Sequence, residues 1–526
     1  MRVLVCDNLD AVGVDVFRAA EGVEVDVNND LTPAALIDVI GDYEGLVVRS
    51  KTKVTAEVIE AGTRLKVIGR AGTGVDNIDV PAATRRGIVV MNAAAGNTVT
   101  TAEHAIALVM ALARKIPAAS ATTKAGKWEK TKFTGVELNN KTLGIVGVGK
   151  IGSVVANRAK GLGMHVLAYD PYLSHEAAAK MGVELVALAE IFARADFVTV
   201  HTPLTAETRG IIGKDEFAAM KHGVRVVNCA RGGLVDEAAL YDAIVSGKVA
   251  GAALDVFEQE PVAADNPLLK LEQVVATPHL GASTEEAQAG VATLIADQMV
   301  EYLQRGTIRG AVNFASLNAE QLAELRPYLL LGEKLGLFTG QAFGRNLTDV
   351  EFDYSGDVAA YDVTPISQAI LTGILSPVVE RMNPVNASVV AEERGIRVRQ
   401  STDRQPRDYA NQIVVRATSD EGSHEIVGAL FGKTDGRIVR VDGFDLEAVA
   451  DGHMVLVSNL DVPGVIGKIA TLLGNAGINI SRFYLGRKSA GGEAMALIQI
   501  DDPIDDDRLA ALASLPNIVS ARRIDL

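Results

Sequence analysis

The sequence predicts an α/β protein with two doubly wound parallel-sheet lobes, followed by an α+β segment and a ferredoxin-like tail. Short apolar runs alternate with helical patterns over residues 1–315, which is typical of βα units that build a parallel sheet. A glycine-rich turn joins one of these runs to a helix at residues 147–152. Residues 454–524 follow the order strand, helix, strand, strand, helix, strand, which indicates a ferredoxin-like sheet.

Length and composition favour a multidomain protein of the cytoplasm. A chain of 526 residues, 48% of them hydrophobic, is long enough for about three or four domains. Its net charge of −15 argues against a nucleic-acid partner and against binding to an anionic membrane. Two cysteines, Cys6 and Cys229, fit a reducing compartment. We expect no signal peptide and no membrane span, because a strand-like run starts at Val3 and no long apolar run follows.

Residues 142–170 predict a Rossmann-like dinucleotide-binding unit. A buried strand over residues 143–146 leads into Gly147, Gly149 and Gly152, spaced as G-x-G-x-x-G, and a helix follows. Gly147 permits the tight turn, Gly149 lets the backbone approach a pyrophosphate, and Gly152 lets helix and strand pack closely. The pyrophosphate would lie at the helix N-terminus, where free N–H groups and the helix dipole favour an anion.

The end of the next strand indicates which dinucleotide binds. Asp170 closes that strand at the place where a carboxylate accepts hydrogen bonds from the adenosine ribose hydroxyls. Pro171, Tyr172 and Leu173 come next, and none of them can hold a 2′-phosphate. The sequence therefore predicts NAD rather than NADP.

In the first lobe, strands are expected at residues 3–6, 46–48, 67–68 and 89–91, and cations follow two of them. Arg49, Ser50 and Lys51 come after the second of these strands, and residues 70–74 come after the third. Asn97, after a glycine turn, is a further candidate. Because ligands bind at the carboxyl ends of strands in such sheets, two clustered cations suit an anionic substrate. The alternative is a solvated charge cluster.

Four later strands deliver polar residues to one rim of the second sheet. The strands are expected at residues 197–201, 224–227, 251–254 and 274–276. Arg231, Glu260 and His279 lie beyond three of them, and this set suits the oxidation of a 2-hydroxy acid. An arginine can grip and polarise a carboxylate or carbonyl bidentately, and a histidine can take the hydroxyl proton. A glutamate can hold the imidazole in one tautomer and favour its charged form.

Two features between the lobes carry weaker signals. A helix over Thr98–Arg114 contains Glu103 and His104, which point about 100° apart and so favour helix packing over joint catalysis. Trp128 lies in a basic connection that we expect at the surface or in an interface.

Three motifs closely resemble the NAD-dependent D-2-hydroxyacid dehydrogenases. They are VVNCARGGLVD at 226–236, AALDVFEQEP at 252–261 and PHLGAST at 278–284. Residues 47–54 (VVRSKTKV) and 69–79 (GRAGTGVDNID) look like the branch of that family that oxidises D-3-phosphoglycerate. The resemblance implies that Arg231, Glu260 and His279 are the catalytic set.

The resemblance also implies binding residues and a domain order. The cofactor would be lined by Thr73, Gly147, Gly149, Lys150, Ile151, Gly152, Asp170, Thr202, Cys229, Ala230, Arg231, Asp255, His279, Gly281 and Ala282. The phosphorylated acid would be held by Arg49, Ser50, Gly72 and Asn97. An NAD-binding domain at 98–282 would be inserted in a substrate-binding domain formed by 1–97 and 283–315, with a cleft between them. No metal site is expected.

Residues 316–451 and 452–526 have counterparts in the long form of this branch. The first segment resembles its intervening domain, which acts in regulation and assembly. The second resembles the ACT domain, which binds amino acids, and the family's effector contacts fall on Asn459, Asp461 and Asn479. The resemblance implies a homotetramer that L-serine inhibits.

The sequence thus predicts NAD-dependent oxidation of D-3-phosphoglycerate to 3-phosphohydroxypyruvate, the first step of serine synthesis. Two alternatives stay open. One is another D-2-hydroxyacid dehydrogenase, acting on glycerate, lactate or 2-oxoglutarate. The other is a sensor that binds NAD and an amino acid without turnover, although an intact Arg231, Glu260 and His279 set counts against it.

Overall fold

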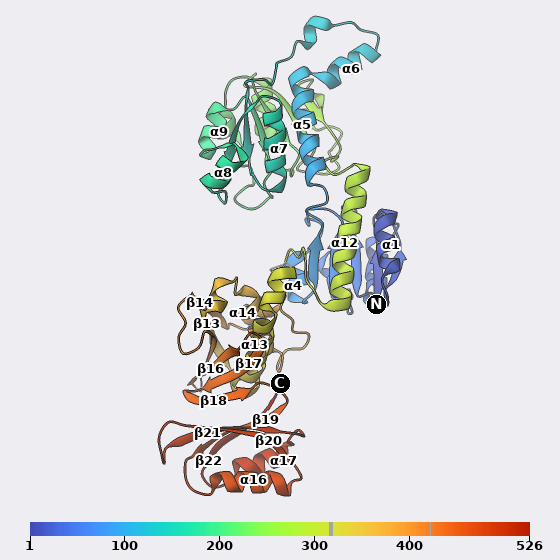
Figure 1. Ribbon diagram of the computed structural model, residues 1–526. Coiled ribbons are helices and arrows are strands. Elements are labelled where there is room, and N and C mark those ends of the chain that lie inside the picture. The colour runs from blue at the N-terminus through green and yellow to red at the C-terminus, as the bar shows by residue number, and fades with distance from the viewer. Residues whose placement is uncertain (315–318, 421) are drawn as a thin grey trace.

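The computed structural model describes residues 1–314, 319–420 and 422–526, and these form an elongated molecule (Figure 1). Its four sheets define four parts, which we call the first lobe (β1–β5), the second lobe (β6–β12), the middle domain (β13–β18) and the tail domain (β19–β22). The second lobe lies at one end of the molecule and the tail domain at the other. The predicted boundary between residues 315 and 316 falls outside the described residues.

The first lobe is a five-stranded parallel sheet in the order β2-β1-β3-β4-β5. Its strands are β1 (Arg2–Val5), β2 (Glu24–Val27), β3 (Gly45–Val48), β4 (Val67–Arg70) and β5 (Val89–Asn92), and its helices are α1 (Ala11–Ala19), α2 (Pro33–Val39), α3 (Ala56–Ala61) and α4 (Val80–Arg85), with a 3-10 turn η1 (Ile40–Asp42). The central β3 is buried throughout, as its unbroken apolar run predicts. The edge strand β2 was not predicted, because its exposed acidic residues give no apolar run.

Two long helices connect the lobes (Figure 1). They are α5 (Thr98–Arg114) and α12 (Glu285–Arg305). On its return, α12 packs Ala292, Ile295 and Met299 into the core of the first lobe. The chain then follows β5, where Val312 N donates to Val90 O at 2.7 Å.

The second lobe is a seven-stranded parallel sheet in the order β12-β11-β10-β9-β6-β7-β8. Its strands are β6 (Thr142–Val146), β7 (His165–Tyr169), β8 (Glu184–Leu185), β9 (Phe197–Val200), β10 (Val224–Asn228), β11 (Val249–Leu254) and β12 (Val274–Ala276). Its helices are α6 (Ile116–Lys124), α7 (Lys150–Gly161), α8 (His175–Met181), α9 (Leu188–Arg194), α10 (Lys214–Ala219) and α11 (Glu237–Val245), with 3-10 turns η2 (Lys130–Phe133) and η3 (Pro267–Lys270). The chain order reverses between β6 and β9, so the turn after β6 lies at the switch point where such sheets bind ligands.

Helix α6 projects from the second lobe as an arm (Figure 1). In the described part of the chain, no single helix is long and apolar enough to cross a membrane. The pair α5 and α6 reaches that length and composition only when taken together, and the two helices are bent by 64°.

The middle domain packs helices on a six-stranded sheet in the order β14-β13-β15-β16-β17-β18. Its strands are β13 (Leu347–Gly356), β14 (Arg397–Asp403), β15 (Asn411–Ser419), β16 (Gly422–Phe431), β17 (Asp435–Val441) and β18 (Phe444–Val449), and its helices are α13 (Ala319–Phe343), α14 (Thr364–Leu375) and α15 (Ala387–Glu393), with a 3-10 turn η4 (Asp357–Ala360). The long α13 was not predicted. It packs an apolar stripe into the core, through Leu331, Leu335 and Phe338. Gly336 lets α14 come close beside that stripe, since a β-carbon there would lie 2.0 Å from Ile370 O.

The tail domain is an antiparallel sheet in the order β20-β21-β19-β22. Its elements are β19 (His453–Leu460), α16 (Val465–Asn475), β20 (Ile480–Arg487), β21 (Glu493–Ile500), α17 (Asp506–Ala513) and β22 (Ile518–Asp525). One face is covered by its own helices, through Val457 and Ile469, and the other face joins Leu456 and Leu497 to the core of the middle domain. The α/β fold class with a ferredoxin-like tail is therefore confirmed.

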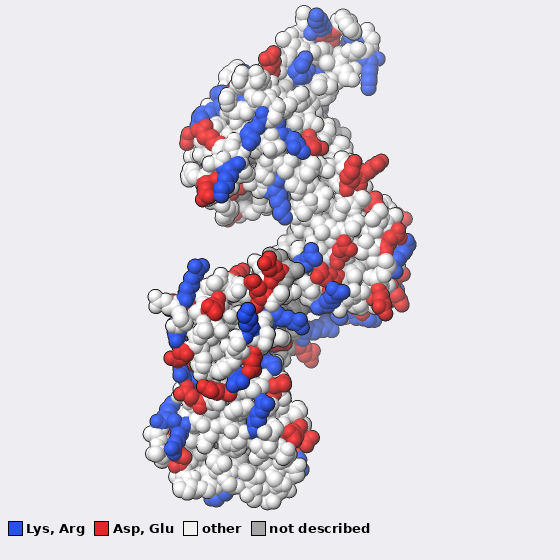
Figure 2. Space-filling model, viewed as in Figure 1, with Lys and Arg blue, Asp and Glu red and all other residues white. Residues whose placement is uncertain are grey.

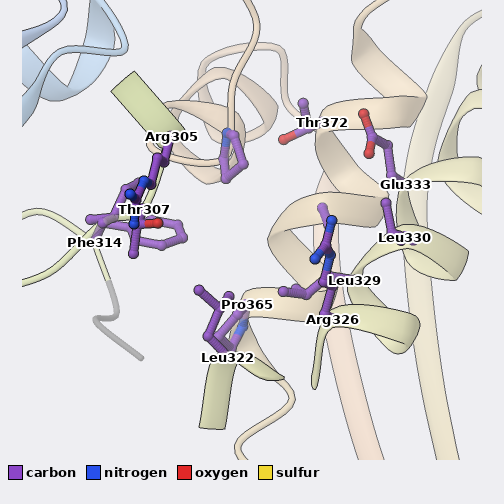
Figure 3. A pocket seen from close by; sticks show the side chains of 14 residues that line it. Arg305, Thr307, Phe314, Leu322, Arg326, Leu329, Leu330, Glu333, Pro365 and Thr372 are labelled. Atoms are coloured by element: carbon purple, nitrogen blue, oxygen red, sulfur yellow. The ribbon is translucent and has the colours of Figure 1, made fainter. Parts of the chain in front are cut away.

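The first lobe meets the middle domain through a small contact. Val385 inserts into the core of the first lobe, and Asn383 Nδ2 donates to Gly87 O at 2.7 Å. Beside this contact lies a cavity of about 740 Å³, walled by the end of α12 and by α13 and α14. In Figure 3, Arg305 and Phe314 lie on one side of it and Leu329 and Arg326 on another. The two parts are therefore joined by a polar turn and one apolar side chain rather than by a continuous core.

Candidate active site

The structure brings His279 and Glu260 into contact. Nδ1 of His279 lies 2.7 Å from Oε2 of Glu260, and Oε1 of Glu260 accepts from Phe257 N at 3.1 Å. A proton on Nδ1 leaves Nε2 free to accept a proton, and no residue in the described ranges is bonded to Nε2. Burial raises the pKa of the Glu260 carboxyl, but the hydrogen bond and charge of His279 outweigh it, so this pKa lies below its ordinary value. The pair is suited to general-base work.

Asp255 fixes the loop that carries His279. Its side chain is fully buried, and it accepts from Thr277 Oγ1 at 2.6 Å, Leu280 N at 2.7 Å and Gly281 N at 2.8 Å. His279 itself has a left-handed backbone, with φ of 56°, and its N–H donates to Asp255 O at 2.9 Å. The carboxylate of Asp255 thus holds the loop that carries His279. That Asp255 also lines the cofactor stays a prediction.

His104 also contacts Asp255, whereas the sequence analysis assigned it to helix packing. Its Nε2 lies 3.1 Å from Asp255 Oδ1 and 3.3 Å from Thr277 Oγ1. Glu103 points elsewhere, toward Arg158. Burial raises the pKa of the Asp255 carboxyl, and hydrogen bonds from His104, Thr277 and Leu280 lower it further than that, so the group stays ionised at neutral pH. Because the partners are 151 residues apart, only the fold reveals them.

Arg231 reaches from the second lobe to the first. Its Nε donates to Asp76 Oδ2 at 3.1 Å, and its Nη1 donates to Ala230 O at 2.6 Å. A β-carbon on Gly74 would lie 1.8 Å from Arg231 Nη2, so the absence of a side chain there admits the guanidinium. The same arginine that the sequence assigned to substrate thus stands at the boundary between the lobes.

Arg70 is a candidate that the sequence list omitted. Burial and the charges of Arg231 and Arg49 lower the pKa of its guanidinium to about 10. Among the described residues, its buried Nε has no hydrogen-bond partner, and its Nη1 donates to Ala71 O at 3.2 Å. Arg49 and Arg231 lie close enough to disfavour the charge of Arg70, and such a group of guanidiniums suits an anion. The sequence could have indicated Arg70 by its position at the end of β4, but it could not show that Arg70 would be buried.

The other predicted substrate residues line the loops of the first lobe. Arg49 N donates to Asp7 Oδ2 at 2.9 Å, and Arg49 Nη1 donates to Asn8 O at 3.3 Å. Ser50 is exposed beside it. Asn97 is buried and its Oδ1 accepts from Thr73 Oγ1 at 2.7 Å, which ties the loop around Gly72 to the start of α5. Asp7, also absent from the predicted set, is what anchors the Arg49 loop.

The turn after β6 fits a dinucleotide. At Gly147, with φ of 93°, a β-carbon would lie 2.7 Å from Thr202 Cγ2, and at Gly152 it would lie 2.1 Å from Gly147 O. Nothing lies within 4 Å of a β-carbon built on Gly149, which caps α7 without a side-chain bond. The open space and the free N–H groups at Lys150 and Ile151 therefore suit a pyrophosphate. The Thr202 side chain lies beside this turn, and its buried hydroxyl has no hydrogen-bond partner among the described residues.

The remaining predicted cofactor residues differ in what they can offer. Asp170 Oδ2 accepts from Val148 N at 2.8 Å and its Oδ1 from Tyr172 N at 2.9 Å, so each oxygen keeps a lone pair for a ribose hydroxyl. Burial raises the pKa of the Cys229 thiol, which stays neutral and packs in the core of the second lobe. The Cys229 side chain is thus buried, whereas Ala230 is partly exposed. Gly281 and Ala282 close the rim next to His279.

Comparison with known proteins identifies the family. The model of the D-isomer specific 2-hydroxyacid dehydrogenase NAD-binding domain matches residues 106–281, that of the D-3-phosphoglycerate dehydrogenase intervening domain matches 324–442, and that of the ACT domain matches 453–517. A D-3-phosphoglycerate dehydrogenase of Synechocystis sp. is 45% identical, over 100% of this chain and 95% of that protein. Another, from Archaeoglobus fulgidus, is 45% identical over 100% of both.

The chain belongs to the D-3-phosphoglycerate dehydrogenase family. It is an NAD-dependent oxidoreductase, as the sequence predicted. Solved structures resemble its two lobes. A glyoxylate reductase from Paecilomyes thermophila is 31% identical with a TM-score of 0.54 and covers 59% of this chain and 98% of its own. The apo D-lactate dehydrogenase of Escherichia coli is 29% identical with a TM-score of 0.53 and covers 59% of this chain and 100% of its own.

Cofactor choice in this family member can be tested at Asp170. Asp170→Ala is expected to weaken NAD binding and to relax discrimination against NADP, because the carboxylate accepts from the ribose and repels a 2′-phosphate. Asp170→Asn keeps an acceptor for Val148 N and removes only the charge, so it should relax discrimination with a smaller loss of NAD affinity. The measurement is the ratio of kcat/KM for NAD and NADP. A wild-type enzyme that prefers NADP would contradict this role.

Proposed function

We propose that this protein oxidises D-3-phosphoglycerate to 3-phosphohydroxypyruvate with NAD, as the first step of L-serine synthesis. The observation that supports it is the group of Arg49, Arg70 and Arg231 at the boundary between the lobes. Arg70 and Arg231 lie over Gly72 and Gly74 of one loop, and the charges of Arg231 and Arg49 lower the pKa of Arg70. A substrate with a carboxylate and a phosphate supplies several negative charges at once. A simple monocarboxylate would leave part of this positive charge uncompensated.

Each group in the site has a distinct role in this proposal. Arg231 grips the carboxylate through the fork of its guanidinium. His279 takes the proton of the C2 hydroxyl on Nε2, and Glu260, 2.7 Å from Nδ1, stabilises the imidazolium that results. Bound NAD supplies the acceptor for the hydride that leaves C2. The cofactor would be held by the turn at Gly149 and by Asp170.

The substrate is tested by the formation of NADH with a panel of 2-hydroxy acids. Arg49→Ala is expected to raise KM for D-3-phosphoglycerate by about 10- to 150-fold, since a charge-assisted hydrogen bond is worth about 1.5–3 kcal/mol. KM for D-glycerate, which lacks the phosphate, should change much less. Lys53→Ala, an exposed cation on the same loop, is the matched control and should leave both constants unchanged.

Two outcomes of this panel would reject the proposed substrate. Equal effects of Arg49→Ala on the phosphorylated and unphosphorylated acids would mean that Arg49 does not contact the phosphate. A higher kcat/KM for D-lactate or 2-hydroxyglutarate than for D-3-phosphoglycerate would favour another D-2-hydroxyacid dehydrogenase.

We also propose that L-serine binds the tail domain and inhibits the enzyme. Asp461 pairs with Arg487 at 2.9 Å and keeps its second oxygen for an ammonium group, and Asn479 offers a carbonyl while its Nδ2 donates to Asp501. Asn459 is buried, and its Oδ1 is unpartnered in the described structure. The strand β22 forms one edge of the sheet, and an edge of this kind favours pairing with a second copy.

L-Serine is expected to inhibit the wild type, and Asp461→Ala is expected to abolish that inhibition with kcat unchanged. Inhibition requires serine to bind two arrangements of the enzyme with different affinity, by typically about 1–3 kcal/mol. Calorimetry measures serine binding, and assays with added serine measure inhibition. Asp502→Ala is the control, because Asp502 is exposed and directly follows Asp501. Deleting the tail is a poorer test, because it would expose the apolar face that Leu456 and Leu497 cover. No serine binding to the wild type would contradict the proposal.

A homotetramer in the cytoplasm completes the proposed function. The α6 arm carries exposed Ile116, and Trp128 just beyond it is 87% exposed, which is typical of a surface that a second copy covers. Light scattering of Trp128→Ala tests this, and an unchanged oligomer would place the interface elsewhere.

A further inference from the structure

A second cavity at the junction of the first lobe and the middle domain is lined by cations. Its volume is about 490 Å³, within the range of small-molecule sites. Arg64, Lys66 and Arg86 reach it from the first lobe and Arg381 from the middle domain, against one carboxylate, Glu44. Lys and Arg side chains also gather at this junction in the face shown in Figure 2. This positive charge stands out in a chain of net charge −15.

Two of these cations are already paired and two are not. Glu44 accepts from Arg64 and, at 2.7 Å, from Arg2 N, while Arg86 pairs with Glu60 at 2.6 Å. Lys66 and Arg381 have no ion-pair partner among residues 1–314, 319–420 and 422–526. The cavity therefore keeps an excess of positive charge, and a concave site focuses that charge on a bound anion.

The turn that presents Arg381 is held rigidly against the first lobe. Asn383 Nδ2 donates to Gly87 O at 2.7 Å, and Asn386 Nδ2 donates to Arg381 O at 3.2 Å and to Arg85 O at 3.4 Å. Arg381 has a φ of 61°, a left-handed conformation that side-chain-bearing residues seldom adopt. Its carbonyl is thus fixed while its guanidinium stays free at the cavity.

We propose that this cavity binds a phosphorylated or pyrophosphate-bearing small metabolite, distinct from the substrate of the active site. Arginine forks match phosphate oxygens bidentately, and lysine adds a point charge, so the set suits an anion with more than one charge. A ligand that contacts both Lys66 and Arg381 stabilises the docked arrangement of the two parts. Lys66 directly precedes β4 and Arg70 ends it, so this cavity and the active site lie at opposite ends of one strand, about 13 Å long.

The test uses inorganic pyrophosphate on the full-length protein at constant ionic strength. Calorimetry gives the number of pyrophosphate sites per chain. Competition between pyrophosphate and substrate gives the inhibition constant of pyrophosphate at the active site. With saturating NAD present to occupy the turn at Gly149, wild type is expected to bind pyrophosphate at one more site per chain than the competitive site. In Lys66→Ala/Arg381→Asn, affinity at the extra site should fall by about tenfold or more, while the competitive constant and kcat stay unchanged. Asparagine tolerates the left-handed backbone at position 381.

Two further variants show whether lost pyrophosphate binding is specific to the cavity. Lys433→Ala/Arg404→Asn makes the same side-chain changes at exposed positions of the middle domain and should retain both sites. Lys66→Ala alone leaves the turn intact and should still weaken the extra site. Wild-type binding that is fully accounted for by the competitive site overturns the proposal. So does equal binding by the cavity variant and by its control.

Discussion

His279→Ala is expected to lower kcat by about 10²–10⁴-fold while NAD still binds, since the loss of a general base typically has this cost. The imidazole is the group whose Nε2 is free, and neither it nor Glu260 supplies the ribose contact. Steady-state formation of NADH measures kcat, and fluorescence titration measures NAD binding. Wild-type turnover in this variant would reject the assignment of the base.

Glu260→Gln provides the matched comparison for His279. The amide keeps a hydrogen bond to Nδ1 but removes the charge 2.7 Å away, so the imidazolium loses its counter-charge. We expect a smaller loss of kcat than in His279→Ala and a changed pH profile of kcat/KM, because the charge that faces the base is removed. An unchanged pH profile would mean that Glu260 does not act through His279.

Arg231→Ala is expected to reduce kcat/KM by about 10- to 150-fold for each hydrogen bond lost to the substrate carboxylate, at about 1.5–3 kcal/mol per bond. The effect should be equal for D-3-phosphoglycerate and D-glycerate, because both carry the carboxylate. That equality separates Arg231 from Arg49, whose effect should depend on the phosphate.

Arg231→Lys tests whether geometry or charge matters at this position. Lysine keeps the charge but lacks the planar fork, so we expect it to recover only part of the loss. Full activity in Arg231→Lys would show that a point charge near Asp76 is sufficient, and it would contradict a bidentate grip.

Local chemistry made much of the active site predictable. The spacing of Gly147, Gly149 and Gly152 indicated a turn, an open approach and a close helix contact, and the β-carbon distances at these positions agree with each role. His279 and Glu260 were paired by chemical reasoning and lie in contact. Strand-end positions predict such sites because parallel strands bring their carboxyl ends to one edge.

Other elements had no local signal strong enough to predict them. The edge strand β2 is exposed and acidic, so no apolar run marked it. Helix α13 is a different case: its buried Leu331, Leu335 and Phe338 belong to the apolar stripe by which helices are recognised, so this signal was present and was missed.

The sequence by itself determined the order of βα units, the dinucleotide turn, the acid–base pair and the family, because these depend on short motifs and on residue types at strand ends. Only the tertiary structure decided that the Nε of Arg70 is buried close to Arg49 and Arg231, that His104 supports Asp255, and that a cationic cavity lies at the junction of the first lobe and the middle domain. The reason is distance along the chain. His104 and Asp255 are 151 residues apart, and Arg231 and Asp76 are 155 apart, so packing alone brings their charges together and sets their burial.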